Sequence, residues 1–140
     1  MSNGGVKSRD LQYAVIFLRI ALGVGYLSAV ADRFGLWGSF GTASVTWGNF
    51  HNFVAYVGKL NPWCPAALVP ALSWIATVAE TVIGVALISG LFRRIVSLLS
   101  GLMALSFAVA MTAVLGVHAP LNYSVFVVAA ASFVLAAIRD

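Results

Sequence analysis

The chain has 140 residues, of which 61% are hydrophobic and 9% are charged, and its formal net charge is +4. Soluble domains are about 45–50% apolar and about 25% charged, so this chain has too little polar surface to cover a water-soluble fold. The composition indicates an integral membrane protein, with residues 1–140 forming one domain. Nucleic acid is not an expected partner, because the basic residues are scattered and do not interleave with aromatic residues in a stripe.

Four continuous apolar runs predict membrane-spanning helices. A hydrocarbon core about 30 Å thick requires roughly 20 apolar residues in a helix. Strands of a membrane barrel would instead alternate apolar and polar residues. We therefore expect an all-α fold, an antiparallel bundle of four transmembrane helices, over residues 12–31, 66–89, 95–115 and 121–138.

The segment 32–65, between the first two runs, is too long for a tight turn and too polar to span a membrane. Its second half places apolar residues at helical spacing, which predicts an amphipathic helix in the membrane interface or across the end of the bundle. These apolar residues are Trp47, Phe50, Phe53, Val54, Val57 and Leu60. Whether this helix only packs as a lid or admits a substrate stays open.

The basic residues predict how the bundle is oriented. Five of them flank the ends of the runs on the side of the chain termini, whereas two lie on the opposite side. By the positive-inside rule both termini are cytoplasmic, and the chain crosses the bilayer several times. The first group is Lys7, Arg9, Arg93, Arg94 and Arg139, and the second is Arg33 and Lys59.

Three of the runs carry a stripe of residues on one helix face, and in the second and third runs the stripe consists mostly of small residues. Such stripes let helix backbones approach closely inside lipid, so we expect them to face the bundle interior. The stripes are Arg19, Gly23 and Tyr26; Ser73, Thr77, Glu80 and Gly84; and Ser97, Gly101, Ala104, Ala108 and Thr112.

Two charges interrupt the apolar runs, Arg19 in the first and Glu80 in the second. A charge at mid-membrane costs about 2.5–3.5 kcal/mol on insertion scales, so such residues usually face the interior and pair. In antiparallel helices the two charges reach a similar depth, and Tyr26 and Thr77 share their faces. These four residues are the candidate site, a buried ion pair or ligand pocket. It either fixes helix register, the interpretation we favour, or binds an anionic or quinone-like ligand or carries a proton.

The sequence offers no other redox or catalytic group. Haem in a bundle commonly takes His or Met axial ligands, and both His51 and His118 lie outside the apolar runs. The single cysteine, Cys64, excludes an internal disulfide and a C-x-x-C pair. We expect no catalytic residue, no metal site and no cofactor held by the chain itself, with a quinone as the one redox ligand that the pocket admits.

The chain resembles the DoxX family, the DoxX/DoxD-like four-helix membrane proteins, over roughly residues 12–138. The segments that carry this resemblance are Arg19–Gly23, Ser28–Gly35, Gly58–Trp63, Glu80–Gly90 followed by Arg93, and Ala119–Ser124. Arg19 and Glu80 match an arginine and a glutamate that recur in the family's first two helices. Arg33 stands where members often carry a basic residue, whereas Asn122 departs from an acidic one.

The resemblance implies a four-helix protein of the bacterial inner (plasma) membrane. The family takes its name from subunits associated with thiosulfate:quinone oxidoreduction and terminal oxidases. It implies an accessory or anchoring subunit of a membrane oxidoreductase or quinone-linked system, not catalytic alone, with other membrane or soluble oxidoreductase subunits as partners. Two alternatives stay open: a protein that binds or transports a small amphiphile, and a purely structural membrane scaffold.

Overall fold

The computed structural model describes residues 8–139, and the regular secondary structure of this part of the chain consists of helices, without strands. The helices are α1 (Ser8–Arg33), α2 (Phe50–Leu60), α3 (Val69–Ser89), α4 (Arg93–Leu115), α5 (His118–Asn122) and α6 (Val125–Ala137). A 3-10 turn, η1 (Ala66–Leu68), leads into α3. Three segments of the described chain are long and apolar enough to span a membrane: Ser8–Arg33, Ala66–Ser89 and Arg93–Leu115.

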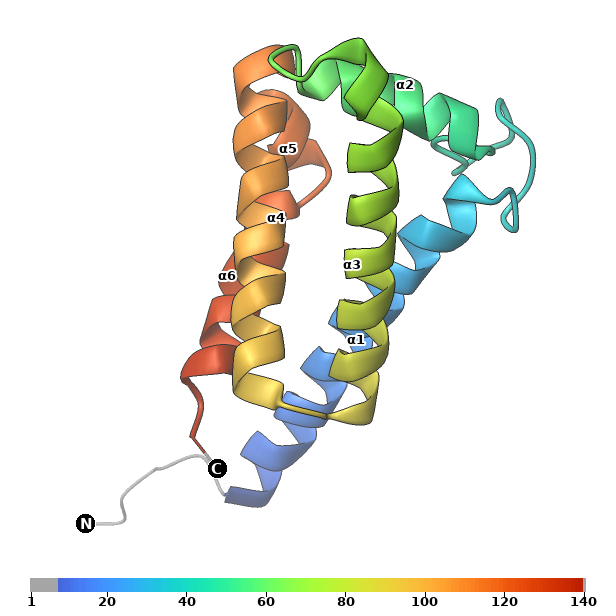
Figure 1. Cartoon of the computed structure of the whole chain (residues 1–140). Helices are drawn as coiled ribbons and strands as arrows, with labels where there is room; N and C mark the ends of the chain where they lie inside the picture. The colour runs from blue at the N-terminus through green and yellow to red at the C-terminus, as the bar shows by residue number, and fades with distance from the viewer. Residues whose placement is uncertain (1–7, 140) are drawn as a thin grey trace.

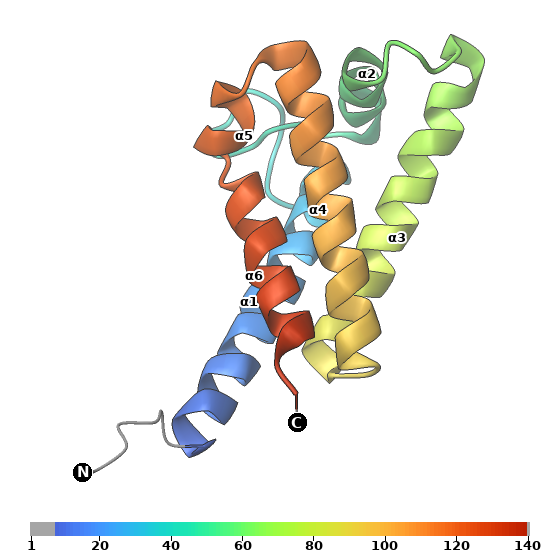
Figure 2. The same ribbon diagram turned by 90° about the vertical axis from the view of Figure 1, so that its left-hand side faces the viewer.

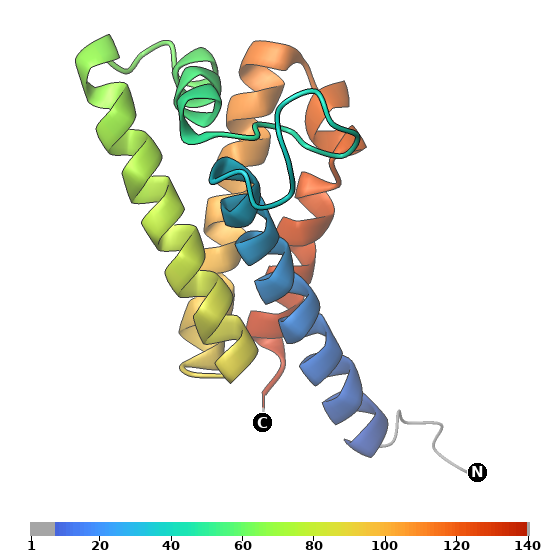
Figure 3. The same cartoon turned by 90° about the vertical axis from the view of Figure 1, so that its right-hand side faces the viewer.

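Helices α1, α3, α4 and α6 form the bundle, and α2 lies across one of its ends (Figure 1). We call this the cap end. The opposite end, where α1 begins and α6 finishes, is the terminal end. The start of α1 extends beyond the other helices at the terminal end, and α3 diverges from α4 toward the cap end (Figures 2 and 3).

The cap helix α2 confirms the predicted amphipathic helix. Asn49 caps its start, because the Asn49 side chain accepts a hydrogen bond from the Asn52 backbone N–H at 2.8 Å. Phe53, Val57 and Leu60 are its buried face, at the spacing that the sequence indicated. The apolar stripe of α2 is thus the face that packs against the end of the bundle.

The first run forms a longer helix than predicted. Helix α1 begins at Ser8 and ends at Arg33, whereas the apolar run covers 12–31. This difference changes which residues can form the site. The apolar run leaves Arg33 in the segment after the helix, whereas in the structure Arg33 belongs to the last turn of α1 and is buried.

The fourth predicted span, 121–138, is not one continuous helix. Helix α5 ends at Asn122, Ser124 adopts a left-handed backbone with φ of 56°, and α6 has 13 residues. Ser and Asn side chains compete for backbone hydrogen bonds and favour such interruptions. Because α6 is about 20 Å long at 1.5 Å per residue, it is shorter than a spanning helix.

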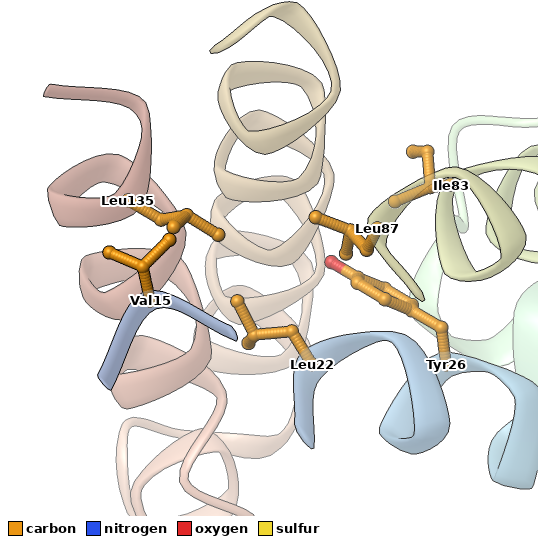
Figure 4. Packing of buried hydrophobic residues seen from close by; sticks show 6 residues of the cluster. All are labelled: Val15, Leu22, Tyr26, Ile83, Leu87 and Leu135. Carbon is orange, nitrogen blue, oxygen red and sulfur yellow. The ribbon is translucent and has the colours of Figure 1, made fainter. Parts of the chain in front are cut away.

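The predicted inward faces are buried. Each member of the α3 stripe is buried, as are Gly23, Tyr26 and four of the five stripe residues on α4. Figure 4 shows the apolar cluster beside them, to which α1, α3 and α6 contribute. Its residues are Val15, Leu22, Tyr26, Ile83, Leu87 and Leu135.

Helices α1 and α3 pack closely at two glycines. A Cβ added to Gly23 would lie 2.7 Å from the Gly84 carbonyl oxygen, which is too close for any side chain. This contact places the two glycines opposite each other and thereby sets the antiparallel register of the two helices.

Candidate functional site

The predicted ion pair between Arg19 and Glu80 is wrong. Arg19 donates from Nε to the Leu87 carbonyl oxygen at 3.0 Å and from Nη2 to the Ile88 carbonyl oxygen at 3.1 Å. These carbonyls lie in the last turn of α3, where a helix carries unpaired acceptors and a partial negative charge. Arg19 is therefore a side-chain cap of α3.

The register explains why the two predicted partners miss each other. Since Gly23 lies opposite Gly84, Arg19, four residues earlier, lies opposite Ile88. Glu80 is eight residues before Ile88, which corresponds to about 12 Å along a helix. The depth estimate from the sequence aligned the ends of the apolar runs, whereas α1 actually extends beyond α3 at the terminal end (Figure 1).

The partner of Glu80 is Arg33. Arg33 Nη2 donates to Glu80 Oε2 at 2.5 Å, and the two side chains are 3% and 2% exposed. Arg33 Nη1 donates to Thr77 Oγ1 at 3.0 Å, and the Thr77 hydroxyl donates to the Ser73 carbonyl oxygen at 2.8 Å. Glu80 and Thr77 thus share one site, as predicted, but around a different arginine.

Aromatic rings from the cap cover this ion pair. The Arg33 guanidinium carbon lies 3.7 Å from the centre of the Phe53 ring and 5.2 Å from the centre of the Trp47 ring. Both distances are within the range of cation–π attraction, which strengthens where water is excluded. The rings therefore seal the pair as well as stabilise the cation.

Asp32 holds this cover in place. Its carboxylate accepts hydrogen bonds from the backbone N–H groups of Thr46 at 2.8 Å, Gly48 at 3.1 Å and Trp47 at 3.4 Å. Adjacent residues of α1 thus have complementary roles, since Arg33 binds side chains of α3 and Asp32 binds the backbone of the segment that carries Trp47. One carboxylate therefore holds the segment 46–48 against the end of α1.

Asp32 is not among the residues that the sequence pattern predicts for the site, and Arg33 stands out in the sequence only as a flanking charge and a family match. One signal was present: an acidic and a basic residue stand side by side where the first apolar run meets a polar segment. Charges at such a junction can turn back into the bundle when the helix continues through them.

Tyr26 takes part in a separate polar joint. Its hydroxyl donates to the Ser100 carbonyl oxygen at 2.9 Å and accepts from the Ser100 hydroxyl at 3.0 Å. The Ser100 and Ser132 hydroxyls are 2.8 Å apart, so the joint links α1, α4 and α6. Neither Tyr26 nor Arg19 has a hydrogen bond to the carboxylate of Glu80, so the four predicted residues divide among three places in the bundle.

Four buried side-chain polar atoms have no hydrogen-bond partner within the described residues. Three of them belong to the cluster just described: Arg33 Nε, Glu80 Oε1 and Trp47 Nε1. The fourth is Ser97 Oγ, on α4. The ion pair is therefore tightly sealed but not fully satisfied by its own neighbours.

A hollow in the described part of the chain lies elsewhere. It has a volume of about 650 Å³ and is lined by one face of α4 and by the turn after α2, with mostly apolar side chains. It contains none of Arg19, Arg33, Glu80 or Tyr26. Its lining is Leu60, Asn61, Pro62 and Trp63 on one side and Leu102, Leu105, Ser106, Val109, Ala110, Ala113 and Val114 on the other.

The other side chains that could bind a metal or haem do not belong to this cluster. His51 and His118 are exposed, Cys64 is half-buried, and the described residues contain no group of three or more His, Cys, Asp or Glu side chains that could hold a metal ion. In the cap, burial raises the pKa of the Tyr56 phenol above its ordinary value, and the nearby Tyr123 adds to the rise. Tyr56 is therefore neutral at physiological pH.

No family model, curated protein or solved structure matches this chain. The resemblance to the DoxX family accordingly rests on the sequence motifs alone.

Proposed function

We propose that this chain is a DoxX-type subunit of the bacterial inner membrane that anchors or assists a quinone-linked oxidoreductase. In this proposal α1, α3 and α4 cross the bilayer, and α5 with α6 completes a fourth crossing. Residues 118–137 number 20, about the length that a hydrocarbon core requires, although the helix is interrupted. The basic flanks favour cytoplasmic termini.

One observation carries the proposal: the charges within the bundle are engaged by the bundle itself. Arg33 binds Glu80 and Thr77, and Arg19 binds two carbonyls of α3. Charges that are committed to internal bonds hold helices in register, which is the task of an anchor. Electron transfer in such a system would be the work of partner subunits.

The lateral surface supports a role among lipids or partner helices. Large hydrophobic side chains are exposed along α1, α3 and α4, among them Phe17 at 75%, Ile75 at 67% and Val109 at 58%. A soluble protein rarely exposes so continuous an apolar surface. The exposed apolar side chains are therefore suited to contact with lipid, and part of the same surface is suited to contact with hydrophobic helices of partner subunits.

A second candidate function, binding or transport of a small amphiphile, is favoured by the hollow beside α4. Its volume lies within the range of small-molecule sites, about 300–1,000 Å³. The apolar lining suits a hydrocarbon or isoprenoid tail, and Asn61 and Ser106 are the polar side chains at its edge. A quinone would therefore bind here and not between Arg19, Glu80 and Tyr26.

The test is purification of the tagged full chain from native membranes in a mild detergent. The proposal predicts oxidoreductase subunits in fixed proportion to the chain, and membranes without the chain should lose at least half of a quinone-linked activity. A chain that purifies alone, from membranes whose quinone-linked activities do not depend on it, contradicts the proposal. Uptake of an amphiphile by liposomes containing only this chain would establish the second candidate instead.

A further inference from the structure

We propose that Arg33, Glu80 and Trp47 enclose a binding site for a single hydroxyl group, supplied either by a water molecule or by a hydroxylated amphiphile. The inference concerns the cluster under the cap, and it is independent of the proposed function.

The unpartnered atoms provide the first argument. A buried polar atom without a hydrogen bond loses its interactions with water and gains none in return, so native proteins rarely leave several together. Three of the four such atoms among the described residues belong to side chains around one guanidinium. Ordered water, or a ligand, commonly satisfies polar groups of this kind.

Contact between the three side chains provides the second argument. Arg33 Nη2 donates a hydrogen bond to Glu80 Oε2. The unpartnered atoms Arg33 Nε and Glu80 Oε1 therefore belong to the same guanidinium and the same carboxylate that form this ion pair. The Trp47 ring lies over the same guanidinium. All three unpartnered atoms are therefore buried, and they belong to the Arg33 guanidinium itself and to the two side chains that contact it.

Hydrogen-bond chemistry defines the ligand. Arg33 Nε and Trp47 Nε1 can only donate, whereas the ionised carboxylate oxygen of Glu80 can only accept. The complement is an oxygen atom that accepts two hydrogen bonds and donates one, which is a hydroxyl or a water. A carbonyl has no proton for Glu80, and an anion would be repelled by it, so a quinone carbonyl and a carboxylate do not fit.

The cap controls access to this site. Trp47 is carried by the segment 46–48, which Asp32 holds through three backbone N–H groups. The site is complete only when this segment is in place. Entry of anything larger than water thus requires the Asp32 contacts to open.

The experiment observes the indole N–H of Trp47 by nuclear magnetic resonance, with the full chain in lipid nanodiscs. The variant Trp47→Phe, which keeps a ring over Arg33, identifies the signal by its loss. Trp63→Phe is the matched control, because Trp63 is 74% exposed. The proposal predicts a cross-peak between the Trp47 N–H and a long-lived, oxygen-bound proton.

Two additions distinguish the sources of the hydroxyl. A hydroquinone with a decyl tail should replace the water cross-peak and shift the Trp47 signal if the site takes hydroxylated amphiphiles, whereas its oxidised quinone should do neither. If both leave the water cross-peak unchanged, the occupant is water. Absence of any cross-peak to an oxygen-bound proton, with no shift on adding the hydroquinone, overturns the proposal. In that case Arg33 Nε and Glu80 Oε1 pair directly in the membrane.

Discussion

Two arginines of α1, Arg19 and Arg33, are satisfied in different ways. Arg33 is 2% exposed and binds a carboxylate beneath aromatic rings, whereas Arg19 is half-buried and binds the backbone carbonyls at the end of α3. Arg33 depends on a partner that is itself costly to bury. Arg19 uses acceptors that every helix end provides. A charge within an apolar helix thus does not require an opposite charge on its neighbour, since a helix terminus at the same depth is sufficient.

Removal of the carboxylate should have the largest effect. Glu80→Leu leaves Arg33 buried without its counterion, and loss of one partner of a buried pair costs about 3–5 kcal/mol in soluble proteins. The combined change Arg33→Met with Glu80→Leu should recover most of this loss. The measurement is the free energy of unfolding in mixed micelles titrated with sodium dodecyl sulfate.

Val78→Leu, at an exposed position on the same helix, serves as the control for Glu80→Leu. Equal stability of Glu80→Leu and the control would show that Arg33 does not depend on this carboxylate.

Loosening of the cap should have the next largest effect. Asp32→Ala removes the acceptor of three backbone N–H groups, and each unsatisfied group costs about 1–3 kcal/mol unless water replaces the carboxylate. Amide hydrogen exchange at residues 46–48 should accelerate at least tenfold, while the buried middle of α3 is unchanged. Asp10→Ala, at an exposed position of α1, is the matched control. Unchanged exchange at 46–48 would refute the role of Asp32.

Loss of the other arginine should be milder. Arg19→Met keeps the length of the side chain but removes both hydrogen bonds to α3, for an expected loss of about 1–3 kcal/mol. The carbonyls at a helix end can turn to water or headgroups, so less is lost than at Glu80. A destabilisation by Arg19→Met as large as that of Glu80→Leu would contradict the contrast between the two arginines.

Gly90 sharpens the role of Arg19 further. It has φ of 79° and ψ of 11°, and a Cβ there would collide with the Arg19 guanidinium. A left-handed backbone alone disfavours alanine by about 1 kcal/mol. Gly90→Ala should be destabilising by more than this amount, and the excess should vanish in an Arg19→Met background. An excess that persists without Arg19 would refute the cap.

Much of the fold could be predicted from the sequence, since apolar length and small-residue spacing report directly on helices and their buried faces. The α2 stripe and the 66–89 segment were predicted in this way. The interruption at Ser124 was not, because the composition of 121–138 remains apolar on both sides of it. Whether α5 and α6 together cross the membrane stays a prediction.

The site was harder to predict than the fold. Glu80 and Thr77 were correctly placed together, because residues three apart in one helix lie side by side on the same face. Their partner on α1 depended on how far α1 slides along α3, which the contact between Gly23 and Gly84 sets and run lengths do not reveal. The predicted register of α1 against α3 was wrong by about two helical turns, and Arg19 was therefore named as the partner of Glu80 in place of Arg33.

The most direct test of the central claim, that Glu80 pairs with Arg33 and not with Arg19, is a pair of double-mutant cycles on unfolding in mixed micelles. One cycle combines Glu80→Gln with Arg33→Met, and the other combines Glu80→Gln with Arg19→Met. We expect a coupling free energy of about 1–3 kcal/mol in the first cycle and less than about 0.5 kcal/mol in the second. A larger coupling between Glu80 and Arg19 would contradict this account.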